Sequence, residues 1–243
     1  MRKQILTLLL LILATPAFGF LGVTGKAEID SNSKNVYRGV ERSDNFVIQP
    51  NASVSAFGLR AKLFNNITLD PDGDLKKLDE TDLTVRYDLG AMGFNITPGI
   101  KYYHFYNMDK DPNTVEVSLG VSYTLLGIIG IYSTHYLDVV KDFGKYYGNI
   151  GAAFKFDMLP IIGIEGNMDI NWQKPYYNDG SDFVIPYSLN VGAAVKFKPM
   201  PLVYIKGHVD ATILLDGDVK KANDSINKDN NILYFGLALG VEL

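Results

Sequence analysis

The chain has 243 residues, no cysteine, 27 acidic and 23 basic residues, and a formal net charge of −4. The lack of cysteine excludes a disulfide-stapled secreted scaffold, and the acidic balance argues against nucleic acid as a partner. Apolar residues make up 47% of the chain and aromatic residues 12%. This composition and length suit a single all-β unit with a large apolar surface.

The first residues are typical of a secretory signal. A basic start, MRK, is followed by a leucine-rich apolar run and then by AFG, which offers small residues for cleavage. A transmembrane anchor is the alternative, but the run is short and no stop-transfer pattern follows it. We predict that residues 1–19 are a cleaved signal peptide and that residues 20–243 form the mature domain.

The rest of the sequence divides into alternating segments. The longest apolar run, residues 125–132, is too short for a spanning helix, whereas a barrel strand needs only about 9–11 residues. In the segment 80–89, for example, Leu83 and Val85 alternate with Asp82 and Thr84. In chain order, the predicted strands are 23–32, 46–57, 59–68, 80–89, 94–105, 114–124, 128–137, 146–157, 161–172, 183–197, 202–214 and 231–243.

The connections between these strands are alternately short and long. Short turns such as FG, GAMG, LLG, MLP and KPMP alternate with longer loops rich in Asp, Asn, Lys and Gly. Short turns face the periplasm in bacterial barrels, and the strand number is even. We therefore predict an all-β fold, a transmembrane antiparallel up-and-down β-barrel of about 12 strands in the bacterial outer membrane, with both termini periplasmic.

Aromatic residues gather near both ends of the predicted strands, as expected for girdles at the two membrane interfaces. A soluble β-sandwich also alternates, but it has no reason to place aromatic residues at both strand ends. Near the short turns they are Phe57, Phe94, Tyr123, Phe156 and Phe197, and near the long loops they are Tyr102, Tyr103, Phe105, Tyr136, Tyr146, Trp172, Phe183 and Phe235.

The last segment, 231–243, carries large apolar residues on one face and small ones, Gly236, Ala238 and Gly240, on the other. We predict that the large face contacts outer-membrane lipids and that this strand closes the ring against 23–32, leaving no open edge in lipid. The segment is similar to the C-terminal signal read by the barrel-assembly machinery, although it ends in Leu243 instead of an aromatic residue.

Charged residues fall on the opposite parity from the large apolar ones. On the lipid face at mid-membrane, Lys or Arg would cost about 2–4 kcal/mol, so these side chains are predicted to point into a wet lumen. The predicted pore-lining residues are Lys26, Glu28, Asp30, Arg60, Lys62, Asp82, Arg86, Asp88, Lys101, Glu116, Lys155, Glu165, Asp169, Lys196, Lys206 and Asp210.

Whether this lumen is open or plugged is left undecided by the strand number, because eight-stranded barrels are filled and those of sixteen to eighteen are open. The mixed signs predict weak charge selectivity, and an ion-paired plug is the alternative. Inward small residues favour a channel, because they leave room for water: Gly99, Gly120, Gly151, Gly192 and Gly236.

The polar stretch between the first two strands contains Arg38, Glu41 and Arg42. We predict that this stretch folds inward and narrows the pore, with Arg38 paired to a lumen carboxylate. The sequence from residue 35 to 66 also resembles the start of the TorF-type porins. The match lies in an aromatic residue followed by Arg-Gly, a polar stretch and Gln49, although Phe46 stands where that family often has proline. The resemblance implies an outer-membrane barrel with a pore role and no catalytic residues.

Other motifs carry little chemistry. In the stretch DPDGDLKKLDETD, Gly73 is the fourth residue from Asp70, whereas an EF-hand loop needs glycine at its sixth position between helices, so a solvated loop is favoured. The histidines lack metal spacing, and we predict no metal and no cofactor. Ser133 and His135 share a face, but two neighbouring residues make a poor hydrolase site.

We therefore predict a channel for passive diffusion of small polar solutes or ions, and not an enzyme. A closed structural or adhesive barrel acting through its extracellular loops is the first alternative. An outer-membrane lipid-acting hydrolase is the second alternative. The solute and the oligomeric state are left open by the sequence.

Overall fold

The computed structural model describes residues 22–69, 75–106, 113–173, 185–217, 220–221 and 229–243. The predicted signal peptide and part of the acidic loop that follows Leu69 lie outside these residues. The strands are β1 (Val23–Asn32), β2 (Asn35–Tyr37), β3 (Val40–Ser43), β4 (Val47–Ala56), β5 (Leu59–Leu69), β6 (Leu75–Tyr87), β7 (Leu89–Ala91), β8 (Phe94–Phe105), β9 (Asn113–Leu125), β10 (Ile129–Asp138), β11 (Tyr146–Leu159), β12 (Ile162–Gln173), β13 (Ile185–Met200), β14 (Val203–Leu214) and β15 (Asn231–Glu242).

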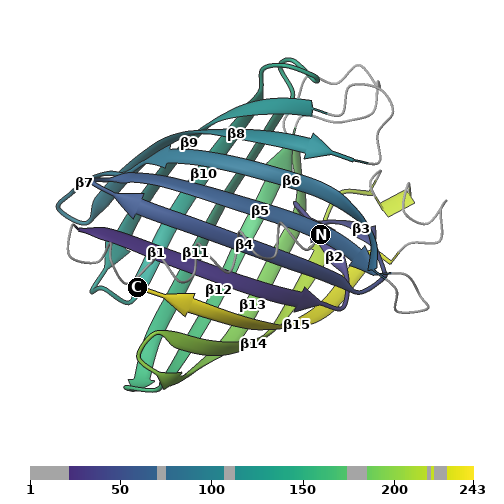
Figure 1. Cartoon of the computed structure of the whole chain (residues 1–243). Coiled ribbons are helices and arrows are strands. Elements are labelled where there is room, and N and C mark those ends of the chain that lie inside the picture. The colour runs from purple at the N-terminus through teal and green to yellow at the C-terminus, as the bar shows by residue number, and fades with distance from the viewer. Residues whose placement is uncertain (1–21, 70–74, 107–112, 174–184, 218–219, 222–228) are drawn as a thin grey trace.

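The long strands close into one antiparallel barrel (Figure 1). Each strand pairs with its neighbours in sequence, the hairpin β2–β3 excepted, and β15 returns to pair with β1 from Lys26↔Glu242 to Asn32↔Gly236. The short strand β7 continues β6 along β8, so β6 and β7 count as one and the barrel has twelve strands. The predicted fold class and strand number are confirmed. No helix within the described residues is long and apolar enough to span a membrane.

The predicted strand limits agree with the structure to within a few residues, with one larger difference. Strand β6 begins at Leu75 instead of residue 80, because Leu69 pairs with Leu75 and lengthens the β5–β6 hairpin beyond its neighbours. The polar stretch after β1 also contains two short strands, β2 and β3, that were not predicted.

Three of the short turns share a two-residue geometry. A non-glycine residue with positive φ precedes a glycine with positive φ at Phe57-Gly58, Met92-Gly93 and Leu126-Gly127. This geometry matches the twist of antiparallel strands and therefore fixes their register. The short turns, the start of β1 and the end of β15 lie at one end of the barrel, and the long connections lie at the other (Figure 1).

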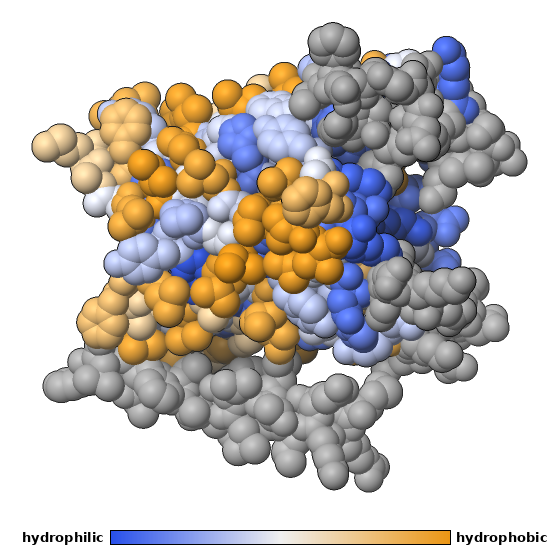
Figure 2. All heavy atoms as spheres, turned by 90° about the horizontal axis from the view of Figure 1, so that it is seen from above, coloured by the Kyte–Doolittle hydropathy of each residue, from blue (hydrophilic) through white to orange (hydrophobic). Residues whose placement is uncertain are grey.

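Large apolar side chains cover the outside of the barrel. Leu63, Ile100, Val195 and Leu237 are all exposed. In the face shown in Figure 2, apolar residues cover most of the strands, and hydrophilic residues gather toward the end with the long connections. This distribution is what a lipid-facing surface requires.

The predicted outer girdle is wrong for three of its members. Tyr103 is only 2% exposed and bonds to Glu116, Phe105 stacks on Tyr103, and Tyr136 packs on Tyr147. These rings point inward because the strand parity decides the face, whereas proximity to a loop does not. Phe183 lies outside the described residues.

Candidate functional site

The unpredicted hairpin β2–β3 lies inside the barrel. Its strands pair only with each other, and Arg38 and Gly39 form its turn, both with positive φ. This is the same turn geometry as at the barrel's short ends. The turn contacts strands on two sides of the lumen, as described next, so the hairpin crosses the interior.

On one side, Arg38 binds Glu116 of β9 with both guanidinium ends. Nη1 donates to Oε1 at 2.8 Å and Nη2 to Oε2 at 2.5 Å, while Nη2 also lies 3.2 Å from the Tyr103 hydroxyl. The guanidinium is 4.2 Å from the Tyr147 ring centroid and 4.9 Å from that of Tyr136. A bidentate pair within an aromatic cage holds Arg38 in one orientation.

Burial alone would lower the pKa of the Arg38 guanidinium. The neighbouring tyrosines Tyr37 and Tyr103 and the bonded Glu116 carboxylate outweigh it, so the pKa lies well above its ordinary value. The side chain is therefore a fixed positive charge at the hairpin tip.

The same side of the hairpin has further anchors. Arg42 pairs with Glu80 of β6 at 2.8 Å and lies over the rings of Tyr37 and Phe105. The Tyr37 hydroxyl is 2.7 Å from that of Tyr103. The third charged residue of the predicted inward group, Glu41, pairs with Lys34 at 2.7 Å.

On the other side, the hairpin tip touches β13 and β14. The Tyr187 hydroxyl donates to the Arg38 carbonyl. A Cβ on Gly39 would collide with Ser188 Oγ, come within 2.8 Å of Ser188 Cβ and lie 3.4 Å from Thr212 Cγ2. Glycine is thus required here both by its φ of 76° and by the closeness of the wall.

Gly39→Ala is expected to destabilise the folded barrel by about 1–3 kcal/mol, because the new methyl group overpacks a closed contact. Adding Ser188→Gly should restore part of the loss, since it removes both colliding Ser188 atoms. Gly207→Ala is the control, because no atom lies within 4 Å of its added Cβ. Urea unfolding measures all of these; equal stability of Gly39→Ala and Gly207→Ala would contradict the tight docking of the tip.

The hairpin tip lies between two cavities. The outer vestibule, about 670 Å³, is lined on the long-loop side by residues such as Glu80, Asp138 and Asn66. The inner chamber, about 500 Å³, reaches toward the short turns and is lined by residues such as Arg60 and Arg86. Tyr37 and Arg38 line both cavities. A third cavity, about 680 Å³, lies along the wall formed by β1 and β11–β15.

Eleven of the sixteen predicted pore-lining residues line one of these three cavities, and most of the sixteen form ion pairs or hydrogen bonds with one another or with neighbouring polar groups. Arg38 takes Glu116, and Asp169 accepts bonds from Asn171 and Asn190. The other ion pairs are Lys26–Glu28 (3.1 Å), Lys206–Glu28 (3.4 Å), Lys101–Asp82 (2.7 Å), Arg60–Asp88 (3.1 Å), Lys155–Glu165 (4.0 Å) and Lys196–Glu242 (2.6 Å).

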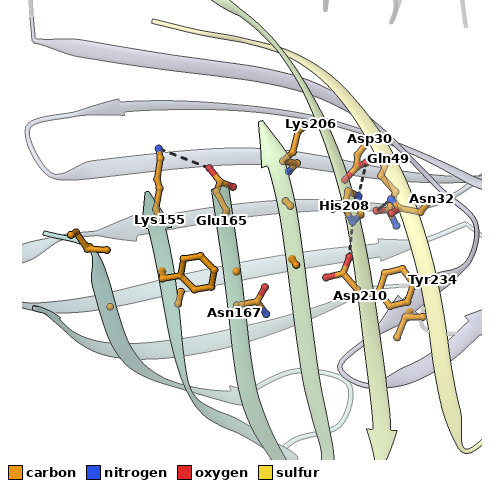
Figure 3. Close-up of a pocket in the computed structure, with 18 of the residues that line it drawn as sticks. Asp30, Asn32, Gln49, Lys155, Glu165, Asn167, Lys206, His208, Asp210 and Tyr234 are labelled. Atoms are coloured by element: carbon orange, nitrogen blue, oxygen red, sulfur yellow. Dashed lines mark hydrogen bonds and ion pairs between the residues drawn. The ribbon is translucent and has the colours of Figure 1, made fainter. Parts of the chain in front are cut away.

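The third cavity contains a linkage that the sequence did not indicate. The two ring nitrogens of His208 face Asp210 at 2.5 Å and Asp30 at 3.2 Å (Figure 3). His208 therefore joins carboxylates from β14 and β1 across the barrel wall. Only the inward parity of position 208, shared with Lys206 and Asp210, could have suggested it.

The inward glycines do not leave the free space that was predicted. At four of them an added Cβ would meet a neighbouring side chain within 3 Å, so polar groups occupy the room: Arg86 and Ser118 at Gly99, Tyr132 and Asp169 at Gly151, Asn167 and Asp210 at Gly192, and Asn32 and His208 at Gly236. At Gly120 the nearest atom is at an ordinary 3.5 Å. Space for solute comes from the cavities between the network and the hairpin.

The Ser133–His135 pair on the outer face is not arranged for hydrolysis. Ser133 Oγ donates to the Asn149 carbonyl at 2.8 Å and lies 3.1 Å from His135 Nε2. In this arrangement the hydroxyl proton is directed at the Asn149 carbonyl, whereas a general base would have to receive it. Tyr146 bonds the other ring nitrogen at 2.5 Å, and Trp172 bonds Tyr146, as in an interfacial aromatic cluster.

Among the described residues, no group of three or more His, Cys, Asp or Glu is arranged to hold a metal ion. Of the sequence stretch weighed for calcium, residues 70–82, the first five lie outside the described residues and the rest belong to β6. The third histidine, His104, lies on the outer face, where Nδ1 is 2.5 Å from Asn113 Oδ1.

Comparisons with known proteins agree with this architecture. No family model matches the sequence, and no curated protein matches it. Among solved structures, the NanC porin superposes with a TM-score of 0.57 at 8% identity, over 88% of this chain and 98% of that chain. The COG4313 outer membrane channel from Pseudomonas putida F1 gives 0.51 at 9% identity, over 91% and 95%. The KdgM porin, solved in complex with disordered oligogalacturonate, gives 0.50 at 9%, over 90% and 97%. The chain thus has the fold of outer-membrane porins and channels.

Proposed function

We propose that the chain is a bacterial outer-membrane channel for passive diffusion of small polar solutes or ions. The observation that carries this proposal is the pair of cavities, outer vestibule and inner chamber, that meet at Tyr37 and Arg38. The apolar exterior and the porin fold support it. In this proposal the short turns and both termini face the periplasm, outer-membrane lipids contact the exterior, and β15 is presented to the barrel-assembly machinery.

The mechanism is selection at a constriction. The hairpin β2–β3 narrows the lumen, and its tip presents Arg38, held by Glu116, beside the rings of Tyr147 and Tyr136. Solutes would pass the wetted vestibules and exchange water for these groups at the narrowest level. Because the predicted TorF-type resemblance centres on Tyr37-Arg38-Gly39, we include the chain in that group as part of the proposal.

A closed barrel acting through its outer loops is the second candidate. It is favoured by the same hairpin, since the tip contacts Glu116 on one side and Ser188 on the other. In that case the hairpin would be a plug instead of a constriction.

Single-channel recording separates the two candidates. The mature chain, residues 20–243, is refolded, its folding is verified by heat-modifiable gel mobility, and it is inserted in a planar bilayer in KCl. We expect discrete conductance steps with a weak ion preference. A demonstrably folded barrel that never conducts would overturn the channel and leave the closed barrel.

A further inference from the structure

The inner chamber carries an excess of positive charge. Five basic side chains line it, Arg38, Arg60, Lys62, Arg86 and Lys101, against a single acidic one, Asp82. Most lumen charges elsewhere are matched by a partner, so this imbalance is local. It lies on the arc of wall formed by β5, β6 and β8.

Three of the five cations are neutralised within the protein. Arg38 binds Glu116, Lys101 binds Asp82 at 2.7 Å, and Arg60 binds Asp88 at 3.1 Å. The other two, Lys62 and Arg86, form no ion pair with a carboxylate of the described residues. Arg86 Nη2 donates to the Tyr136 hydroxyl at 3.0 Å, and Lys62 Nζ is 5.8 Å from the centre of the Phe64 ring.

The register places these two cations side by side. Arg60 pairs with Arg86 and Lys62 with Thr84, so Lys62 and Arg86 are diagonal neighbours, about 7–8 Å apart at the backbone. Arg60 also faces Arg86 directly, but its charge is matched by Asp88, whereas those of Lys62 and Arg86 are not matched by a carboxylate. Two like charges this close repel each other, and an anion bound between them would remove the repulsion.

The remaining wall of the inner chamber is aromatic and can contact the apolar part of an organic ligand. The rings of Phe64, Tyr103, Tyr136 and Tyr147 line the chamber together with the two unpaired cations. An inorganic anion would use only the cations. An organic anion would use the cations for its carboxylate and the rings for its apolar part.

We propose that the inner chamber binds a small organic carboxylate through Lys62 and Arg86. The proposal rests on the proposed function and deepens it, because it names the solute class that the channel passes most readily. Lys and Arg are the side chains that bind carboxylates by charge-assisted hydrogen bonds, and Arg does so in bidentate geometry. The fixed guanidinium of Arg38 forms the far wall of the chamber.

The first test is calorimetric titration of the folded, detergent-solubilised chain with succinate. Succinamide, its neutral counterpart, and inorganic phosphate are titrated in parallel. We expect saturable heat with succinate, none with succinamide, and weaker binding of phosphate. No succinate binding, or phosphate binding as tight as succinate binding, would overturn the organic carboxylate site.

Variants then locate the site. Lys62→Gln and Arg86→Gln should each weaken succinate binding about tenfold or more, because each removes a charge-assisted hydrogen bond. Lys155→Gln is the matched control, since Lys155 is a lumen lysine of the opposite wall with only a 4.0 Å ion pair to Glu165. Equal affinity in all three variants would remove Lys62 and Arg86 from the site.

Binding and conduction are measured separately, so the two proposals fail separately. A folded barrel that binds succinate but does not conduct would keep the site and remove the channel. A barrel that conducts but binds no succinate would keep the channel and remove the site. When both hold, succinate should reduce the chloride current of the native chain and leave that of Lys62→Gln nearly unchanged.

Discussion

Replacing residues 34–44 by a Gly-Ser-Gly linker is expected to raise single-channel conductance several-fold. Strands β1 and β4 pair directly up to Asn32↔Val47, so a short linker can join them without the hairpin. The segment removed contains Tyr37 and Arg38, two of the three residues that line both the outer vestibule and the inner chamber; the third, Tyr103, stays in place. Without it the two cavities become one continuous, wider path.

The chain that lacks the hairpin also needs compensating substitutions, so that it does not unfold for reasons unrelated to the constriction. Removal of the hairpin leaves Glu116 and Glu80, which are almost fully buried in the native chain, without Arg38 and Arg42. Uncompensated buried charges are costly, so the excision is combined with Glu116→Gln and Glu80→Gln. The barrel strands keep their ladder bonds, and heat-modifiable mobility should report a folded ring.

A control of unchanged length isolates the role of the tip. Replacing Tyr37-Arg38-Gly39 by Ser-Asn-Gly keeps the turn chemistry and removes the two large side chains. Its conductance should lie between those of the native and the excised chains. If the excised, folded chain conducted no more than the native chain, the hairpin would not be the constriction.

The barrel itself was predictable because a half-buried strand has a period of two. In β8, for instance, Ile100 and Tyr102 face out while Lys101 and Tyr103 face in, and the sequence carries this pattern without help from distant residues. Strand limits follow from where the pattern stops. Among the barrel strands, the β5–β6 extension is the largest difference, because the spacing of Leu75 and Leu78 does not follow the period of two.

The hairpin was harder to predict because its strands have only three and four residues and mix polar with apolar side chains. Segments this short show no clear period of two. The one available signal was the turn itself: Arg38-Gly39 has the same residue-then-glycine form as Phe57-Gly58. The inward fold was predicted from position alone, between the first two long strands.

The sequence could not predict which lumen side chains contact each other, for a geometric reason. Parity states that Glu116 points inward, but it does not state which inward residues face each other across the ring. Arg38 and Glu116 are 78 positions apart, and Tyr204 and Glu28 are 176 apart. These contacts depend on the curvature of the closed barrel, which only the structure supplies.

Arg38→Ala is expected to lower the free energy of unfolding by roughly 3 kcal/mol, at the low end of the range for breaking a buried ion pair. The Arg38 and Glu116 side chains are only 20% and 9% exposed, so the carboxylate left behind has little access to water. The variant also loses the cation–π contacts with Tyr147 and Tyr136. Reversible urea unfolding from detergent micelles measures the change.

A double-mutant cycle separates the contribution of the Arg38–Glu116 ion pair from that of the aromatic contacts of Arg38. Glu116→Gln alone leaves the Arg38 charge unpaired, whereas Arg38→Gln with Glu116→Gln leaves no charge and should recover much of the loss. The control is Lys198→Ala at the short-turn end, where Lys198 binds Glu242 at 2.5 Å but both side chains are 30% exposed. An exposed pair of this kind contributes only about 0–1 kcal/mol.

The two measurements together decide what Arg38 does. If the Arg38–Glu116 pair only stabilised the fold, the Arg38→Ala variant would be less stable but would conduct like the native chain. The hairpin would then stay in place through Tyr37, Tyr103 and Arg42. A constriction must change both, since the tip then leaves the Glu116 wall and the path widens. We therefore expect Arg38→Ala to conduct more than the native chain while Lys198→Ala does not. Equal stability losses in the two variants would refute the anchoring role of the Arg38–Glu116 pair.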